Sequence, residues 1–326
     1  MTIVPARARA YDRLVPVSWP DHVEEILGAD MTAALAYVTP AGGAVVMAVA
    51  PIGLRDRERG RVGFTTSLGF AKKLDRIRRE PRVALAYHAR EHGGSDRQEF
   101  VLVQGRAEPV AEPTPEDRAL VRRQAEAFLG AGRSGPFWDR WLREYYMVRI
   151  PVWVTAERVT VWPDLSCAGP PELHGLPAPE STPDLQLAPA KGTGPRVKMK
   201  RAAKRLGKTP HLLLGHVGAD GYPLVGPVEL AAWDATGLEL TAAPGVIPEG
   251  VRRAGLLGHD YRPKLIGLTA RQHTGWLEAA DDRGLYAPHS ETGFVAPPNK
   301  TLLLFGNGLQ AKLGVRKARC EGKLPA

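Results

Sequence analysis

Cysteine is scarce in this sequence: only Cys167 and Cys320 occur among 326 residues. Two cysteines cannot build a disulfide framework, so small disulfide-stabilised secreted folds are excluded and a reducing, cytoplasmic setting is expected. Long apolar runs are also missing. The richest stretch, residues 44–54, is shorter than a bilayer span and contains Pro51, so it predicts a buried strand. The basic residues within 1–13 are not followed by an apolar segment, which predicts no secretory signal.

A broad positive surface is missing as well, although the net charge is +9. Eight basic residues and no acidic residue fall within residues 191–208, and the rest of the chain carries only +1. This distribution does not favour a protein that follows nucleic-acid phosphates over a wide face. We expect a solvent-exposed basic helix in this segment, and a phosphate or nucleic-acid contact there is the alternative.

Proline marks the domain organisation. Residues 163–195 hold eight of the 29 prolines and have no helical or strand periodicity, which predicts a linker. It separates a first folded part, residues 1–162, from a second, residues 196–326. Two units of roughly 150 residues are a usual domain size.

The two parts resemble each other in four blocks that occur in the same order. The pairs are Leu35–Gly42 with Leu214–Gly221, Phe64–Gly69 with Leu240–Gly245, Glu80–Leu85 with Arg262–Gly267, and Gln104–Glu108 with Thr274–Glu278. Shared order across four blocks indicates a diverged tandem duplication.

Most of the chain has strand character. Apolar or alternating runs predict strands at 33–38, 45–54, 61–66, 82–88, 100–107 and 148–161, and at 211–217, 223–233, 238–242, 264–270 and 273–277. Helices are predicted at Ala71–Arg79 and Pro115–Leu129, the second one after the capping pattern Thr114-x-x-Asp117. Short strands at regular spacing with one short helix predict a small closed antiparallel barrel in each part.

One strand–turn–helix carries a candidate phosphate site. Lys72 and Lys73 are the only lysines before residue 191, and both lie in the first turn of the predicted helix 71–79. The preceding strand ends in three hydroxyl side chains, those of Thr65, Thr66 and Ser67. Hydroxyls, free helix N–H groups and ammonium groups are phosphate donors, and Arg76 one turn on would add a guanidinium. The alternative is that both lysines are solvated helix positions.

The run from Gly63 to Leu85 resembles the signature of the pyridoxamine 5′-phosphate oxidase-like, split-barrel flavin-binding family. The blocks Phe100–Glu108 and Met147–Trp162 follow in the order of that family. The resemblance covers residues 30–162 well and residues 205–280 more loosely. It implies a mainly β (α+β) fold with two split antiparallel Greek-key barrels in one chain, which form an internal pseudo-dimer.

The resemblance also implies a cofactor, FMN or alternatively a deazaflavin. Its phosphate or tail would be held by Thr65, Thr66, Ser67, Lys72, Lys73 and Arg76. The isoalloxazine face would be lined by Val46, Met47 and Ala48, and Trp276 is either an aromatic wall or a core residue. Ala71 stands where the family often has Ser, and Arg76 where Asn is usual, so the phosphate shell is altered. In the second part Glu249 falls near the register of Lys73, which predicts no cofactor there.

The resemblance, together with the candidate phosphate site, implies a flavin- or deazaflavin-dependent oxidoreductase that transfers hydride or electrons to or from a small organic substrate. The cofactor carries the chemistry, so no catalytic side chain and no substrate can be assigned. The alternative is a non-enzymatic protein that binds flavin or haem, with one of His216, His259, His273 and His289 as haem ligand. We expect no membrane or nucleic-acid partner, and a further homo-oligomer stays open.

The segment His88-x-x-Glu91-His92 matches a zinc pattern formally. That pattern needs a helix to bring both imidazoles to one face, whereas this segment follows a predicted strand and runs into glycines. We interpret it as a polar hairpin without metal.

Overall fold

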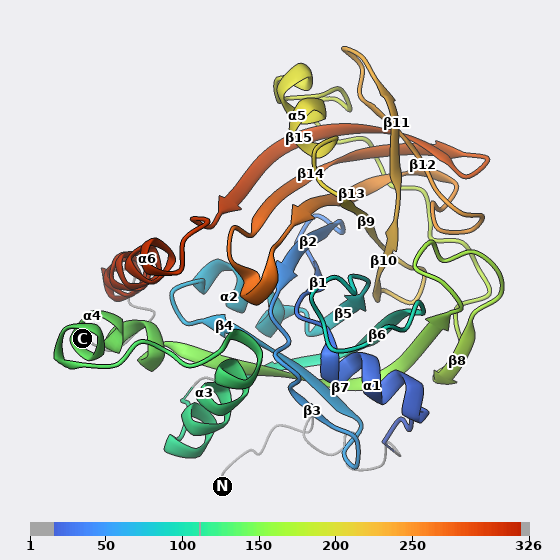
Figure 1. The fold of residues 1–326 in the computed structure, drawn as a ribbon. Coiled ribbons are helices and arrows are strands. Elements are labelled where there is room, and N and C mark those ends of the chain that lie inside the picture. The colour runs from blue at the N-terminus through green and yellow to red at the C-terminus, as the bar shows by residue number, and fades with distance from the viewer. Residues whose placement is uncertain (1–15, 111, 321–326) are drawn as a thin grey trace, which may run out of the picture.

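A computed structural model describes residues 16–110 and 112–320. The N-terminal segment for which the sequence predicts no secretory signal lies outside these residues. The described chain is built around two antiparallel sheets (Figure 1). The first sheet contains β1 (Ala33–Val38), β2 (Ala44–Val49), β3 (Arg55–Asp56), β4 (Arg61–Ser67), β5 (Arg82–Tyr87), β6 (Phe100–Pro109), β7 (Arg149–Trp162) and β8 (Glu172–Gly175). The second contains β9 (His211–Val217), β10 (Pro223–Pro227), β11 (Glu229–Trp233), β12 (Leu238–Thr241), β13 (Gly250–Asp260), β14 (Thr269–Ala280) and β15 (Arg283–Val295).

The helices lie around these sheets. They are α1 (Asp21–Ala29), α2 (Ala71–Arg79), α3 (Pro115–Leu129), α4 (Pro136–Met147), α5 (Met199–Leu206), the short 3-10 turn η2 (Pro263–Leu265) and α6 (Lys300–Cys320). Helices α4 and α6 stand together at one side of the molecule, away from the sheets (Figure 1). No described helix is long and apolar enough to cross a membrane.

Both sheets have the same strand order. The first runs β2-β1-β5-β6-β7-β4-β3, with β8 paired to β7, and the second runs β10-β9-β13-β14-β15-β12-β11. Each strand of the first order therefore has a counterpart at the same place in the second. This topology confirms the predicted fold class, a tandem of two split barrels.

Each sheet curls around its own apolar core. In the first half, alternate residues of β7, namely Ile150, Val152 and Val154, point inward with Val62 and Phe64 of β4, as the two-residue period of a strand requires. A bridge between Thr65 and Ala50 draws the end of β2 toward β4. This curl brings the end of β4 beside the segment that follows β2.

The halves pack through a third apolar cluster made largely of small residues. It contains Ala34, Ala36, Val46, Ala84, Ala86, Phe100, Leu102, Cys167, Leu213, Val225, Leu257 and Ala270. Small side chains allow the strands of the two halves to approach closely. At Gly215 a Cβ atom would collide with the side chain of Val46.

Within the described residues, α-helical insertions between strands occur in the first half only, and the second half has just the 3-10 turn η2 between β13 and β14. The β4–β5 connection contains α2 and the β6–β7 connection contains α3 and α4. The corresponding connection 242–249 of the second half has no helix, and β14 turns into β15 through Asp281 and Asp282, whose φ angles are 54° and 57°. The first half therefore carries structure that its counterpart lacks.

The structure corrects one aligned block. Residues 264–270 are not a strand from their start, because Pro263–Leu265 is a 3-10 turn. The block beginning at Glu80 leads into β5, whose counterpart by strand order is β13 and not the segment after Arg262. The second half lacks a helix at the α2 position, so its chain enters β13 early and Pro263 falls after that strand. Strands β13 and β15 were missed, and β8 lies within the segment predicted as linker.

Candidate functional site

The predicted phosphate corner forms where β4 leads into α2. The Ser67 Oγ accepts a hydrogen bond from the Gly69 N–H at 3.1 Å, and the Leu68 N–H donates to the carbonyl of Val148 at 2.9 Å. Leu74 and Ile77 fix α2 to the barrel through its buried face. The turn is therefore held at a defined position beside the start of β7.

Lys72 and Lys73 do not share an environment. Lys72 is exposed, whereas Lys73 is buried with its Nζ 5.1 Å from the ring centre of Phe70 and 5.9 Å from that of Phe64. Within the described residues Lys73 forms no ion pair with a carboxylate. Burial, together with the charge of Arg149, lowers the pKa of Lys73 to about 7.

The hydroxyl groups at the end of β4 differ in the same way. The Thr66 Oγ1 is buried and has no hydrogen-bond partner among the residues that the structure describes. The Thr65 Oγ1 donates to the Ala50 carbonyl at 3.4 Å. Buried polar atoms normally find a partner, so the Thr66 hydroxyl is a candidate contact for a ligand.

Arg76 lies beside Tyr37, where burial raises the pKa of the Tyr37 phenol and the Arg76 charge opposes that shift.

A cavity of about 160 Å³ adjoins this corner and includes Thr65 in its wall. Its other walls come from α3, α4, β7, η2 and α6, so both halves contribute. The apolar part of the wall consists of Ile52, Val121, Ala125, Leu129, Met147, Ile266, Leu303 and Leu304. Tyr145 and Tyr146 add two aromatic rings.

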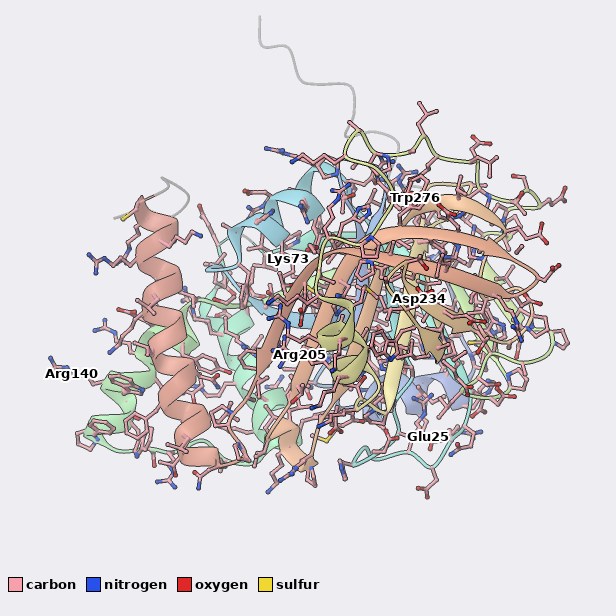
Figure 2. All side chains as sticks on the ribbon, turned by 90° about the horizontal axis from the view of Figure 1, so that it is seen from above. Glu25, Lys73, Arg140, Arg205, Asp234 and Trp276 are labelled. Atoms are coloured by element: carbon pink, nitrogen blue, oxygen red, sulfur yellow. The ribbon has the colours of Figure 1, made fainter. Side chains whose placement is uncertain are left out.

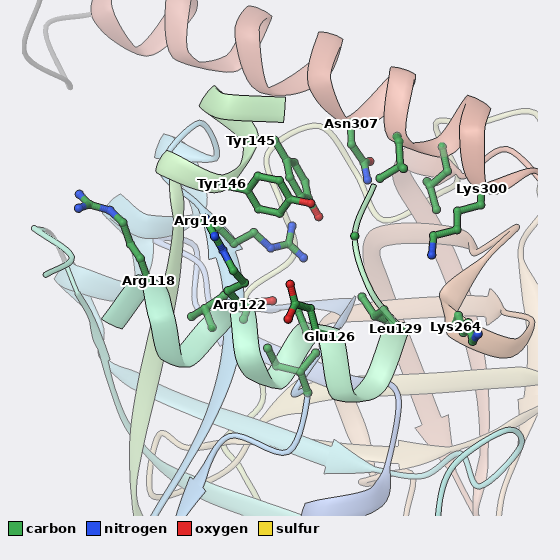
Figure 3. Close-up of a pocket in the computed structure, with 18 of the residues that line it drawn as sticks. Arg118, Arg122, Glu126, Leu129, Tyr145, Tyr146, Arg149, Lys264, Lys300 and Asn307 are labelled. Carbon is green, nitrogen blue, oxygen red and sulfur yellow. The ribbon is translucent and has the colours of Figure 1, made fainter. Parts of the chain in front are cut away.

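Positive charge dominates the cavity. Five cationic residues line it, Arg118, Arg122, Arg149, Lys264 and Lys300, against the single carboxylate of Glu126. Figure 3 shows Arg122 and Arg149 at one end and Lys264 and Lys300 at the other. The guanidinium carbons of Arg122 and Arg149 lie 5.6 and 5.1 Å from the ring centres of Tyr146 and Tyr145. Within the described chain, Arg122, Arg149 and Lys264 form no ion pair, so an anionic ligand would find uncompensated charge.

The remaining predicted residues lie elsewhere. Val46 is fully buried between the halves, and Met47 and Ala48 pack against apolar clusters. Trp276 is 2% exposed, and its Nε1–H donates to Glu278 at 3.0 Å. Of the predicted cofactor-binding residues, only Thr65 lines the cavity.

Sequence reasoning missed most of the cavity wall. Arg122 and Arg149 are two arginines among many, and nothing in their spacing distinguishes them. Lys264 and Lys300 come from the second half, and no alignment of the two parts brings them to Thr65. The available signal was the capping box before α3, which the structure confirms: the Thr114 side chain accepts from the Asp117 N–H.

The segment from His88 to His92 does not assemble a zinc site. His88 is buried between the halves and His92 is exposed. No group of three or more potential metal ligands occurs among the described residues, and no histidine lines the cavity.

Comparison with known proteins finds only distant similarity. No protein-family model matches the chain, and no curated protein matches it. Among solved structures, a conserved hypothetical protein, Rv2991, from Mycobacterium tuberculosis is 21% identical, covers 48% of this chain and 90% of its own, and has a TM-score of 0.35. An F420 reductase is 19% identical over 43% of this chain and 98% of its own, with a TM-score of 0.32.

A third structure is described as a pyridoxamine 5′-phosphate oxidase-related, FMN binding protein from Nostoc punctiforme. It is 13% identical over 61% of this chain and 87% of its own, with a TM-score of 0.30. The description of this third structure names the family that the Gly63–Leu85 motif resembles. Identities this low and TM-scores below 0.5 establish neither a shared ligand nor a shared activity.

Proposed function

We propose that this protein is a flavin- or deazaflavin-dependent oxidoreductase with one cofactor site, located in the first half. The observation that carries the proposal is the cavity beside Thr65, whose wall has five cationic residues and one carboxylate. FMN and deazaflavins combine a flat, largely apolar ring system with an anionic tail. A cavity with aromatic and aliphatic walls and uncompensated cations suits both parts of such a molecule.

The corner residues fit a phosphate-bearing group. In the described part of the chain, the Thr66 hydroxyl is buried without a partner, and Lys73 is buried without a carboxylate partner. A phosphate oxygen would satisfy the first and neutralise the second. Arg149, in register with Ser67 across β4 and β7, connects this corner to the cavity. Lys72 is exposed and would contribute to the local field only.

The asymmetry between the halves supports a single site. Helices α3 and α4, which build much of the cavity wall, have no counterpart in the second half. We infer a tandem duplication in which residues 1–162 kept the cofactor site, residues 163–195 became a connector, and residues 196–326 became its partner barrel. Lys264, Lys300 and Leu303 then act as the contribution of that partner to the site. A cytoplasmic setting belongs to the same proposal.

When bound, a flavin or deazaflavin would accept or donate hydride through its ring system. The apolar and aromatic wall, including Tyr146 and Leu129, would contact the ring, and Arg122, Arg149 and Lys73 would hold the anionic tail. The enclosed wall would also limit the access of water. The absorption spectrum of the purified protein, before and after denaturation, tests this directly. A flavin or deazaflavin spectrum with nicotinamide-dependent reduction is expected.

Two results would separate the alternatives. A bound cofactor that is never reduced or reoxidised by any donor would leave a binding protein instead of an enzyme. If the protein stays colourless after incubation with FMN and with a deazaflavin, the proposal is wrong. Arg149→Gln should lower cofactor affinity at least tenfold, while the matched variant Arg123→Gln, an exposed residue of α3 outside the cavity, should leave it unchanged.

A further inference from the structure

Two lysines of the second half line the same end of the cavity (Figure 3). Lys264 belongs to η2, and Lys300 is the first residue of α6. The Lys300 Nζ donates to the Ala131 carbonyl at 3.0 Å. The stem of Lys264 lies over Gly130, because a Cβ atom on that glycine would be 3.7 Å from the Lys264 Cε. Both side chains therefore lie beside the turn that follows α3, and we refer to them as the lysine pair.

No carboxylate compensates the lysine pair. Neither lysine forms an ion pair among the described residues. The single acidic residue of the cavity wall, Glu126, lies one helical turn after Arg122 and on the same face of α3. Burial raises the pKa of the Tyr146 phenol, and the nearby charges of Arg122 and Glu126 act on it as well. Glu126 thus belongs to the arginine end of the cavity, and Figure 3 shows the lysine pair at the other end.

The turn that carries Lys264 has an unusual backbone. Lys264 and Leu265 have φ angles of 61° and 56°, in the left-handed region that residues with a Cβ rarely adopt. Leu265 packs against the buried side chains of Met31 and Tyr261, so tertiary packing holds the turn in this conformation. Strained backbone of this kind occurs preferentially at ligand sites. Here it accompanies the placement of Lys264 in the cavity wall.

The lysine pair favours an anionic ligand with an apolar body. Two neighbouring ammonium groups repel each other unless an anion lies between them. The chain segments around the pair also contribute aliphatic side chains to the wall, those of Leu129, Ile266 and Leu303. Aliphatic walls with a few charged groups are typical of sites for small molecules. A carboxylate has two acceptor oxygens, one for each ammonium group.

The cofactor phosphate does not require this pair. In the proposed function it lies at the corner of Thr66 and Lys73, and neither of these residues lines the cavity. We propose that the lysine pair binds the carboxylate of the substrate, so that the substrates of this protein are small organic acids with an apolar body. This inference rests on the proposed function, because it assigns the carboxylate to the substrate of that site. The second half would then select the substrate while the first half holds the cofactor.

Calorimetric titration tests the inference without requiring a coloured cofactor or turnover. The probes are two acids, benzoate and hexanoate, and the neutral amides of similar shape, benzamide and hexanamide. Each is titrated into the full-length protein with and without FMN. We expect at least one acid to bind at least tenfold more tightly than its amide. Lys264→Met/Lys300→Met should abolish that preference, whereas Lys264→Arg/Lys300→Arg, which keeps both charges, should retain most of it.

A matched control removes two lysines outside the cavity. Lys204 lies on α5 and Lys208 follows that helix, and both are exposed. Figure 2 shows α5, where Arg205 is labelled, apart from α6. Lys204→Met/Lys208→Met should therefore keep the preference of the wild type for acids. Unchanged thermal unfolding shows that each variant is folded, and if the double variant of the lysine pair is not, Lys264→Met alone should lower the preference severalfold.

The inference is wrong if neither acid is preferred over its amide, if Lys264→Met/Lys300→Met keeps the preference, or if the control variant loses it. It is also wrong if Lys264→Met/Lys300→Met lowers the affinity for FMN or a deazaflavin tenfold, because the pair then holds the cofactor tail. Failure of the proposed function has a different signature. In that case no flavin or deazaflavin binds, yet the acids bind and the variant of the lysine pair loses them, so the carboxylate site stands without the oxidoreductase.

Discussion

The Nε2 of His88 lies 2.6 Å from the Nε2 of His259, and this contact joins the two halves of the molecule. His88 follows β5 and His259 belongs to β13. The His88 Nδ1 lies 3.0 Å from the Ala86 carbonyl oxygen, which can only accept, so Nδ1 carries the ring proton. The His88 Nε2 therefore accepts a hydrogen bond from the His259 Nε2–H. The stacked ring of His211, 4.8 Å from that of His259, extends the cluster. This arrangement requires a neutral His88, because a protonated His88 has no free ring nitrogen to accept from His259.

Acid should therefore destabilise the fold through this pair. Burial lowers the pKa of His88 to about 3, whereas an unfolded histidine has a pKa of about 6.5. As pH falls below about 6.5, the histidine takes up a proton in the unfolded state but not in the folded state. The free energy of unfolding therefore falls between about pH 6.5 and about pH 3, by up to about 1.4 kcal/mol per pH unit for each histidine.

The variant His88→Gln removes one of these groups. Urea unfolding should show that the wild type is less stable at about pH 5 than at about pH 7.5. In His88→Gln this pH-dependent loss of unfolding free energy should be smaller by about 1–2 kcal/mol. His92→Gln is the matched control, because His92 is exposed in the same segment. Equal acid sensitivity of wild type and His88→Gln would contradict this role.

Lys73 should make cofactor binding depend on pH. Its pKa of about 7 means that the ammonium form is lost as pH rises through neutrality, and with it the attraction for a phosphate. Affinity for FMN should therefore fall between about pH 6 and about pH 8.5. Lys73→Met should bind at least tenfold more weakly at the lower pH and show a flat profile. Lys72→Met, a change at the exposed neighbour, should keep the pH profile of the wild type. A flat profile in Lys72→Met would instead show that Lys72, and not Lys73, holds the phosphate.

Local patterns predicted most strands and two helices of the first half, whereas α1 and α4 were not predicted. The helix limits Ala71–Arg79 and Pro115–Leu129 agree with α2 and α3, because the apolar spacing, the capping box and Pro81 all act within a few residues. Strand β13 was missed because its two arginines and three glycines mask the apolar pattern, and Arg252 is in fact buried. Such a sequence forms a strand only because neighbouring strands of the sheet pair with it on both sides.

The candidate site was harder to predict than the fold. Thr65 could be found because it belongs to a local strand–turn–helix motif. Arg149 lies opposite Ser67 through β-sheet pairing, and Lys264 reaches the cavity by packing of one half on the other. Such long-range neighbours depend on register and on the contact between halves, which a single sequence does not reveal.

Gly105 of β6 and Gly275 of β14 lie opposite equivalent bulges, where the partner strands β7 and β15 each carry one extra residue, Glu157 and His289. A Cβ atom on Gly105 would collide with the Thr155 carbonyl oxygen, and one on Gly275 with that of Ala287. Backbone cannot move aside cheaply, so Gly105→Ala and Gly275→Ala should each cost at least about 2 kcal/mol of unfolding free energy. Gly194→Ala, where nothing lies within 4 Å, should stay within about 0.5 kcal/mol of the wild type. Chemical denaturation checks all three, and a harmless Gly105→Ala would mean that the bulge can relax.

Arg158 should be the most costly charged residue to remove at the junction of the halves. Its side chain is 6% exposed and pairs with Asp220 of the second half at 2.8 Å. The same guanidinium donates to the Gln104 Oε1 at 2.9 Å and to two carbonyls of the connecting segment, those of Leu176 and Pro177. Removal of one partner from a buried ionic cluster leaves the others without compensation, which typically costs about 3–5 kcal/mol.

Arg158→Met should therefore lower the unfolding free energy by about 3 kcal/mol and expose residues 163–195 to proteases. The matched variant Arg283→Met removes a pair with Glu239 whose arginine is 69% exposed, so it should cost less than about 1 kcal/mol. If both variants lose the same small amount, the halves are held together by the apolar cluster around Val46 and Leu213, and Arg158 only fills space between them. If Arg158→Met unfolds in two transitions where the wild type shows one, the cluster is what couples the two barrels into a single cooperative unit.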